Sequence, residues 1–104
     1  MINVEVYEKC MKYALIEAVK AFDAGEVPIG CIIVKDNKII GKGFNQVETL
    51  NDATAHAEMI AITSASATIN DWRLIDSFLF VTKEPCPMCA GAILNSRVKA
   101  IIYG

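Results

Sequence analysis

The sequence has no long apolar segment and no recognisable leader. No stretch approaches the ~20 uninterrupted apolar residues that a membrane-spanning helix needs. Residues 1–5 lack the basic segment followed by an apolar run that marks a secretory signal. These absences argue against a membrane partner and lead us to expect a cytoplasmic protein.

Cysteine and clustered positive charge are also scarce. The cysteines, Cys10, Cys31, Cys86 and Cys89, are too few and too unevenly spaced for a secreted disulfide framework, so reduced thiols or a metal site are expected. The net charge is −2, and its acidic excess lies within residues 1–34. Proteins that hold nucleic acid mainly through its phosphates usually show a basic patch, which is missing here. Charge alone therefore weighs against a nucleic-acid partner.

What is present has the composition of a globular domain. The 104 residues are 54% hydrophobic and 21% charged, which differs from disordered chains. A chain of this size has room for one hydrophobic core and no second domain. Since no internal repeat or linker interrupts the sequence, we treat residues 1–104 as one domain.

Local signals predict alternating helices and strands. Apolar residues at three- and four-residue spacing indicate helices, and short β-branched or aromatic runs indicate strands. The expected elements are a helix over 4–24, a hairpin of 29–34 and 38–44, a helix over 55–69, a strand over 78–82, a helix over 87–95 and a strand over 98–103. Residues 45–54 are expected to be irregular. Helices placed between strands predict an α/β layered domain with partly parallel pairing.

Turn and cap residues define these elements further. Gly25 and Pro28 end the first helix, and Asp52 or Thr54 is expected to cap the second. The inward face of the first helix is predicted to hold Tyr7, Met11, Ala14, Leu15, Ala18, Val19 and Phe22. That of the second is predicted to hold Ala57, Ile60, Ala61, Ser64 and Ala65. Core or pocket-wall positions are expected for Cys10, Cys31, Phe44, Trp72, Phe78 and Phe80.

Cys86 and Cys89 lie where a strand leads into a helix. Pro87 suits the first helical position, because its missing N–H would be unpaired there. Three residues rotate a helix by roughly 300°, so the two sulfurs fall on neighbouring sides of the first turn and can reach one ion at ~2.3 Å. The helix N-terminus also favours the thiolate, which is the ligand form.

The only histidine, His56, is the natural third ligand. It lies at the start of the second predicted helix, with Glu58 two residues further on. Residues at that spacing diverge by roughly 200° inside a regular helix, but they can converge at an irregular entry turn. Three protein ligands leave a fourth tetrahedral position for water, as in catalytic zinc sites.

Other interpretations of these residues stay open. Cys86 and Cys89 also suit a redox pair, or half of a structural zinc knuckle that would need two more nearby Cys or His ligands. His56 alone suits an ordinary hydrogen-bonded histidine, and Glu58 alone suits a solvated helix charge.

His56-Ala57-Glu58 followed by Pro85-Cys86-x-x-Cys89 resembles the signature of zinc-dependent cytidine and deoxycytidylate deaminases. Within that family the sequence is most similar to bacterial tRNA-specific adenosine deaminases. This second likeness rests on residues 26–30, 43–45, 71–74 and 84–93.

The resemblance implies a three-layer α/β/α sandwich around a five-stranded mixed sheet, usually in a homodimer. It implies one Zn²⁺ per chain on His56, Cys86 and Cys89, with Glu58 as the proton carrier. The implied reaction is hydrolytic deamination of the wobble adenosine in a tRNA anticodon loop to inosine. Zinc would activate water, and Glu58 would move its proton to the base.

The resemblance also implies a substrate site. Asn45 matches the position that contacts the base edge, the backbone of Val27 and Pro28 lines the pocket, and Ala57 belongs to the same site. For Asn45 the alternative is a loop residue that hydrogen-bonds its own backbone.

The sequence departs from the family pattern in places. Ala53 replaces a usual proline, Lys83 replaces an apolar residue, and the chain stops at Gly104 where relatives continue through another strand and C-terminal helices. The last strand is then expected to be an open edge.

Two alternatives to the tRNA enzyme remain. One is a small-molecule deaminase acting on guanine, cytosine or a cytidine nucleotide. The other is a non-catalytic, zinc-stabilised binding module or subunit, against which the presence of Glu58 argues. A homodimer is also expected because the second and third helices carry small and apolar residues, namely Ala65, Ala67, Met88 and Ala92.

Overall fold

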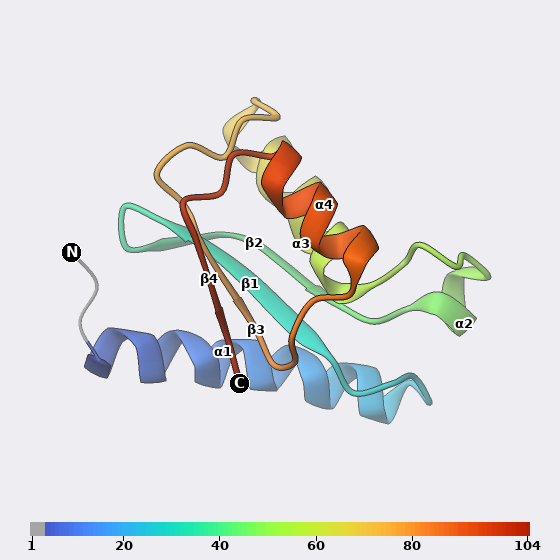
Figure 1. The fold of residues 1–104 in the computed structure, drawn as a ribbon. Coiled ribbons are helices and arrows are strands. Elements are labelled where there is room, and N and C mark those ends of the chain that lie inside the picture. Colours follow the sequence, from blue (N-terminus) through green and yellow to red (C-terminus); the bar gives the residue numbers. More distant parts are fainter. Residues whose placement is uncertain (1–3) are drawn as a thin grey trace.

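The computed structural model describes residues 4–104 and shows helices packed on one mixed sheet (Figure 1). Residues 1–3, part of the segment in which a leader was judged absent, lie outside the described range. The elements are α1 (Val4–Asp23), β1 (Gly30–Lys35), β2 (Lys38–Phe44), α2 (Val47–Leu50), α3 (Ala57–Ile69), β3 (Phe78–Val81), α4 (Pro87–Asn95) and β4 (Ala100–Tyr103). No helix within residues 4–104 is both long enough and apolar enough to cross a membrane.

The sheet has the strand order β2-β1-β3-β4. β1 is antiparallel to both β2 and β3, whereas β3 and β4 run parallel. Asp36 and Asn37 both have positive φ, 52° and 61°, as a tight hairpin turn with the twist of its strands requires. The predicted hairpin is therefore confirmed. Residues 4–104 form four of the five strands that the resemblance implied, with β2 and β4 at the edges of this sheet.

Helices cover both faces of the sheet. α1 lies along one face, and α3 and α4 lie on the other (Figure 1). Ile32 on β1 packs in the core cluster under α1, whereas its neighbours Cys31 and Ile33 pack in the cluster under α3 and α4. Because both faces of β1 are buried, its sequence is a nearly continuous run of apolar residues. The expected three-layer α/β/α sandwich is confirmed.

Glycines in β2 bring α3 unusually close to the sheet. A Cβ on Gly41 would lie 2.5 Å from the carbonyl oxygen of Ala61, and a Cβ on Gly43 would lie 2.6 Å from that of Ala57. The helix backbone therefore rests directly on the strand, with alanines at the contact. This close contact fixes the first turn of α3, next to His56.

The predicted inward face of α1 was wrong in part. Leu15, Val19 and Phe22 are 51%, 58% and 69% exposed. The buried face instead carries small side chains and one ion-paired carboxylate, namely Cys10, Ala14, Glu17, Ala18 and Ala21. The reason is close packing against β1, where a Cβ on Gly30 would clash with the backbone of Ala14 and Ala18. Large apolar residues do not fit at this contact.

Other sequence expectations also needed correction. Residues 47–50 form the short helix α2, and α3 begins at Ala57 without a side-chain cap. Asp52 and Thr54 bond each other in the preceding loop, where the Thr54 N–H and hydroxyl donate to Asp52 Oδ1 at 2.8 and 2.7 Å. Trp72 is 55% exposed rather than in the core. Ala65, which was expected at a dimer surface, is fully buried against Gly41.

Candidate functional site

His56 stands just outside α3 and not within it. It is the N-cap residue, with an extended backbone at φ −77° and ψ 153°, whereas Glu58 is the second residue of the helix. The divergence expected for two residues inside a regular helix therefore does not apply to this pair. The chain turns between them, as the sequence analysis required for a shared site.

Cys86 holds the same position at the start of α4. It is the N-cap residue, with φ −71° and ψ 169°, and Pro87 follows as the first helical residue. Cys89 lies in the first turn and is fully buried. Two helix N-termini, those of α3 and α4, thus carry the three candidate ligands, and the partial positive charge there favours a thiolate.

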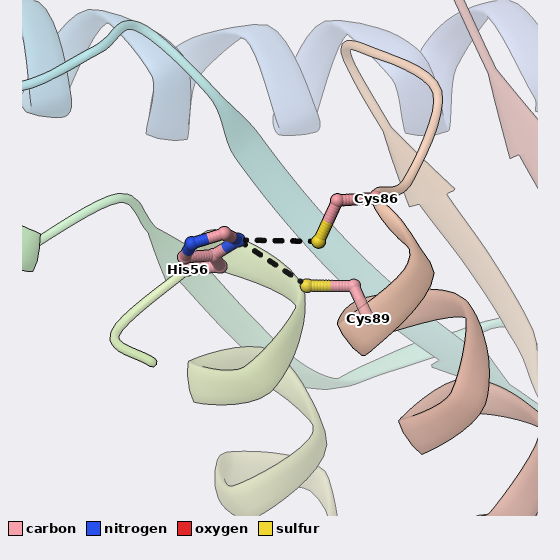
Figure 2. A group of neighbouring side chains, drawn as sticks. All are labelled: His56, Cys86 and Cys89. Carbon is pink, nitrogen blue, oxygen red and sulfur yellow. Dashed lines mark hydrogen bonds between the residues drawn. The ribbon is translucent and has the colours of Figure 1, made fainter. Parts of the chain in front are cut away.

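The three side chains point toward one another (Figure 2). Sγ of Cys86 lies 3.6 Å from Nδ1 of His56, and Sγ of Cys89 lies 3.5 Å from the same nitrogen. Zinc–sulfur bonds of ~2.3 Å and zinc–nitrogen bonds of ~2.0–2.1 Å place a sulfur and a nitrogen ~3.6 Å apart around a tetrahedral ion. The donor set and its spacing therefore fit zinc.

These residues are the full candidate cluster within the described chain. Their ligand atoms all lie within 4.8 Å of one another, and no fourth Cys, His or carboxylate of residues 4–104 joins them. Cys10 and Cys31 are buried free thiols elsewhere in the core, as expected for small apolar residues. The structural zinc knuckle, which needs four protein ligands, is not formed by residues 4–104.

Glu58 lies beside the cluster and is only 4% exposed. Burial raises the pKa of the Cys89 thiol well above its ordinary value, and the charge of Glu58 acts in the same direction. Burial also raises the pKa of Cys31, again with a contribution from Glu58. A bound cation reverses this effect at a coordinating thiol, because it stabilises the thiolate directly.

A cavity of ≈ 420 Å³ opens beside His56. Val27 and Asn45, two of the predicted substrate residues, line it, whereas Pro28 is exposed next to Val27 and does not. The cavity is lined by Gly25, Glu26, Val27, Ile29, Asn45, Val47, Glu48 and His56. Ala57, in the first turn of α3, is fully buried and does not line the cavity.

Asn45 is 6% exposed, and its backbone N–H donates to the carbonyl of Ile29 at 3.1 Å. Asn45 lines the cavity. An amide carries both donors and an acceptor, so this side chain has the groups needed to bond the polar edge of a ligand there.

Sequence reasoning missed Glu26, a buried carboxylate in the cavity wall. Its partners are the N–H groups of Glu48 and Thr49 and the hydroxyl of Thr49. The only hint in the sequence was an acidic residue directly before Val27-Pro28. Its hydrogen-bond partners lie 22 and 23 residues further along the chain, in a segment expected to be irregular, so the sequence did not indicate which groups it would bind.

Comparison with protein-family models gives one match over nearly the whole chain. The model for the cytidine and deoxycytidylate deaminase zinc-binding region matches residues 4–104. Curated relatives include the tRNA-specific adenosine deaminase of Streptococcus pyogenes, 54% identical over 94 residues, which are 90% of this chain and 59% of that protein. The chloroplastic tRNA(adenine(34)) deaminase of Arabidopsis thaliana is 56% identical over 99 residues, which are 95% of this chain and 8% of that protein.

Solved structures of two activities are similar to this chain. A guanine deaminase from Bacillus subtilis has a TM-score of 0.91 and 43% identity, over 99% of this chain and 64% of that one. A tRNA:A34 deaminase described for A-to-I editing at the wobble position has a TM-score of 0.90 and 42% identity, over 93% and 70%. The matched region of this chain covers less than two thirds of the length of the S. pyogenes tRNA-specific adenosine deaminase.

Proposed function

Because the chain belongs to the cytidine and deoxycytidylate deaminase family, we propose that it is a zinc-dependent hydrolase that deaminates adenosine in tRNA to inosine. The observation that carries this proposal is the cluster of His56, Cys86 and Cys89, with Glu58 beside it and a cavity that His56 lines. Relatives 50–56% identical to this chain are named tRNA adenosine deaminases, which supports tRNA as the substrate.

One zinc ion per chain would be held by His56, Cys86 and Cys89. Zinc in a site with three protein ligands lowers the pKa of water from 15.7 towards ~7, which supplies a hydroxide nucleophile at neutral pH. The buried positions of Glu58 and Cys89 keep bulk water from that side of the site.

Glu58 moves the protons. Its carboxylate takes one from the attacking water as the C–O bond forms at the ring carbon that bears the amino group. It passes this proton to the ring nitrogen and then carries the remaining proton of the added hydroxyl to the amino group, so that a C=O bond forms as the C–N bond breaks and ammonia leaves. One water is consumed, and the product is the corresponding oxo base.

Asn45 and the turn that contains Val27 hold the base. The amide of Asn45 donates to and accepts from the polar edge of the base, while Val27 forms part of the cavity wall. The backbone N–H of Ala57, the first residue of α3, has no hydrogen-bond partner within the helix.

Guanine is the second candidate substrate. The B. subtilis guanine deaminase has a TM-score of 0.91 with this chain, and the tRNA:A34 deaminase has one of 0.90. Fold similarity alone therefore favours the two substrates equally. The zinc residues are common to both activities, so the choice depends on how the cavity presents the base. The higher identity to curated tRNA deaminases makes tRNA the primary proposal.

Ammonia release tests the proposal directly. The zinc-loaded protein is incubated separately with a tRNA that carries a wobble adenosine, with guanine, with cytosine and with a cytidine nucleotide. We expect turnover of the tRNA. Turnover of guanine or the cytidine nucleotide without the tRNA would replace this proposal with the small-molecule deaminase. No turnover of any of the four would favour the non-catalytic zinc module.

The protein is further proposed to be a cytoplasmic homodimer. The described cysteines are all free, which suits a reducing compartment that also contains tRNA. Met88 and Leu94 on α4 are 37% and 75% exposed, and Trp72 and Ile75 add apolar surface before β3. These exposed apolar side chains on α4 and in the segment before β3 support self-association.

A further inference from the structure

The short helix α2, over residues 47–50, has little of its own to hold it in place. It is one turn long and contains no buried residue, and its N-cap residue, Gln46, makes no side-chain capping bond. Isolated helices of this length are unstable in water. Something outside the helix must therefore position it.

The carboxylate of Glu26 provides that contact. Oε1 accepts a hydrogen bond from the Glu48 N–H at 3.1 Å, and Oε2 accepts from both the N–H and the hydroxyl of Thr49 at 2.6 Å. These N–H groups belong to the first turn of α2, where a helix has no internal partners for them. Glu26 is 6% exposed, so these charge-assisted bonds are largely shielded from water.

Glu26 connects the two walls of the cavity beside His56. One wall is the turn that contains Val27, and the other begins at Asn45 and continues into α2. Besides Glu26, the backbone bond from Asn45 N–H to the Ile29 carbonyl links these walls. That bond holds the base of the second wall, and Glu26 holds its far end.

We propose that Glu26 is a positioning residue for substrate binding, which clamps residues 46–50 against the turn at 25–29 and so sets the width of the base cavity. This inference rests on the proposed deaminase function. Glu26 does not touch the reacting atoms. It acts through α2 and Asn45, so its loss weakens substrate binding more than it slows the chemical step.

The chemistry of the contact dictates the informative substitution. An ionised carboxylate only accepts hydrogen bonds, which matches the three donors that converge on Glu26. In Glu26→Gln one oxygen becomes an NH₂ group, which faces an N–H and cannot bond to it. The side chain keeps its size but loses its charge and one acceptor oxygen, so the clamp is weakened with little change in packing.

Glu17→Gln is the matched control. Glu17 is another carboxylate that is 5% exposed, and it is paired with Lys20 at 2.7 Å on α1, away from the cavity wall. Thr49→Val supplies a milder variant that removes one of the three donors and leaves the carboxylate ionised, and Thr49→Ser retains all three.

Two measurements test the clamp. In Glu26→Gln the amide protons of Glu48 and Thr49 are expected to exchange with solvent at least about tenfold faster than in the unmodified protein, as loss of bonds to a charged group implies. KM for an RNA hairpin that carries the anticodon loop should rise by about tenfold or more, while kcat should stay within about threefold of the unmodified protein's value. Thr49→Val should raise the amide exchange rate and KM by smaller factors, whereas Glu17→Gln and Thr49→Ser should change neither quantity.

Unchanged amide exchange in Glu26→Gln would overturn the clamp, as would a fall in kcat with unchanged KM, or equal effects in Glu17→Gln. If Glu26→Gln does not fold, Thr49→Val decides by the same criteria. If the unmodified protein turns over a free base instead of the hairpin, KM is measured with that base. A protein that deaminates nothing would refute the proposed function, and amide exchange alone would then judge the clamp.

Discussion

Glu58 carries the proposed chemistry at the scale of single residues. Glu58→Gln is expected to retain zinc and fold but to lose deamination by a factor of about 10²–10⁴, because it removes the proton carrier and preserves its size. Zinc content and ammonia release are measured on the same sample. Glu84→Gln, an exposed carboxylate two residues before Cys86, is the control and should change neither. Loss of zinc in Glu58→Gln would show instead that Glu58 stabilises the metal site.

Glu26 gives a pH prediction at the same scale. The hydrogen bond from the Thr49 hydroxyl is the main cause that lowers the pKa of Glu26 in the folded protein. A lowered folded pKa means that Glu26 stabilises the fold fully above its unfolded pKa of about 4.3, and that this contribution is lost as pH falls through the folded pKa.

The stability difference between the unmodified protein and Glu26→Gln should therefore be constant near neutral pH and shrink below about pH 4. Denaturant unfolding of the two proteins over this range measures it. A difference that is independent of pH down to acid conditions would contradict an ionised clamp.

The candidate metal cluster could be predicted residue by residue, whereas the wall of the cavity beside it could not. His56, Cys86 and Cys89 were found because residue type and spacing near a helix start carry the signal. Glu26 was missed because its role depends on a contact with residues 48 and 49, which no local pattern reveals. Whether Glu58 and His56 converge also required the structure, since it depends on the extended backbone at the N-cap.

At the scale of elements, the seating of α3 on β2 positions the site. Gly43→Ala is expected to destabilise the fold by about 1–3 kcal/mol through overpacking, since the new Cβ would lie 2.6 Å from the Ala57 carbonyl oxygen and 2.8 Å from the Ala61 nitrogen. Activity should fall as well, because the strained turn leads directly from His56. Denaturant unfolding and ammonia release measure the two effects.

Gly91→Ala is the matched control for this prediction. Gly91 lies in α4, and a Cβ there meets nothing within 4 Å. Alanine in a helix interior is favoured over glycine by roughly 0.5–1 kcal/mol, so this variant should be slightly more stable. Equal effects of the two substitutions would contradict the close contact between α3 and β2.

Most elements were predictable because their local patterns agree with their final environment. The hairpin is defined by two apolar runs around Asp36-Asn37, and α4 by Pro87 at its first position. α2 was missed because one helical turn with no buried residue leaves no apolar periodicity. The face of α1 was partly wrong because contact with Gly30 selects small residues, whereas periodicity alone favours the larger Leu15 and Val19.

At the scale of the whole molecule, the order of elements predicted an α/β layered domain, the family resemblance implied its three layers, and the assembly remains a proposal. Light scattering at micromolar concentration is expected to give the mass of a dimer. Leu94→Lys, at a site 75% exposed on α4, should shift it to the monomer, because a charge is costly in an apolar interface. Val19→Lys, at a site 58% exposed on the opposite layer, should leave the dimer intact. A monomeric unmodified protein would contradict the proposed assembly.

We proposed above a catalytic zinc with three protein ligands and one exchangeable position. X-ray absorption at the zinc edge tests it most directly on the purified protein. We expect one zinc per chain with two sulfur neighbours at ~2.3 Å, one imidazole nitrogen at ~2.0–2.1 Å and one further light atom. A third sulfur neighbour, which would have to come from Cys10 or Cys31, or the absence of bound zinc, would contradict it.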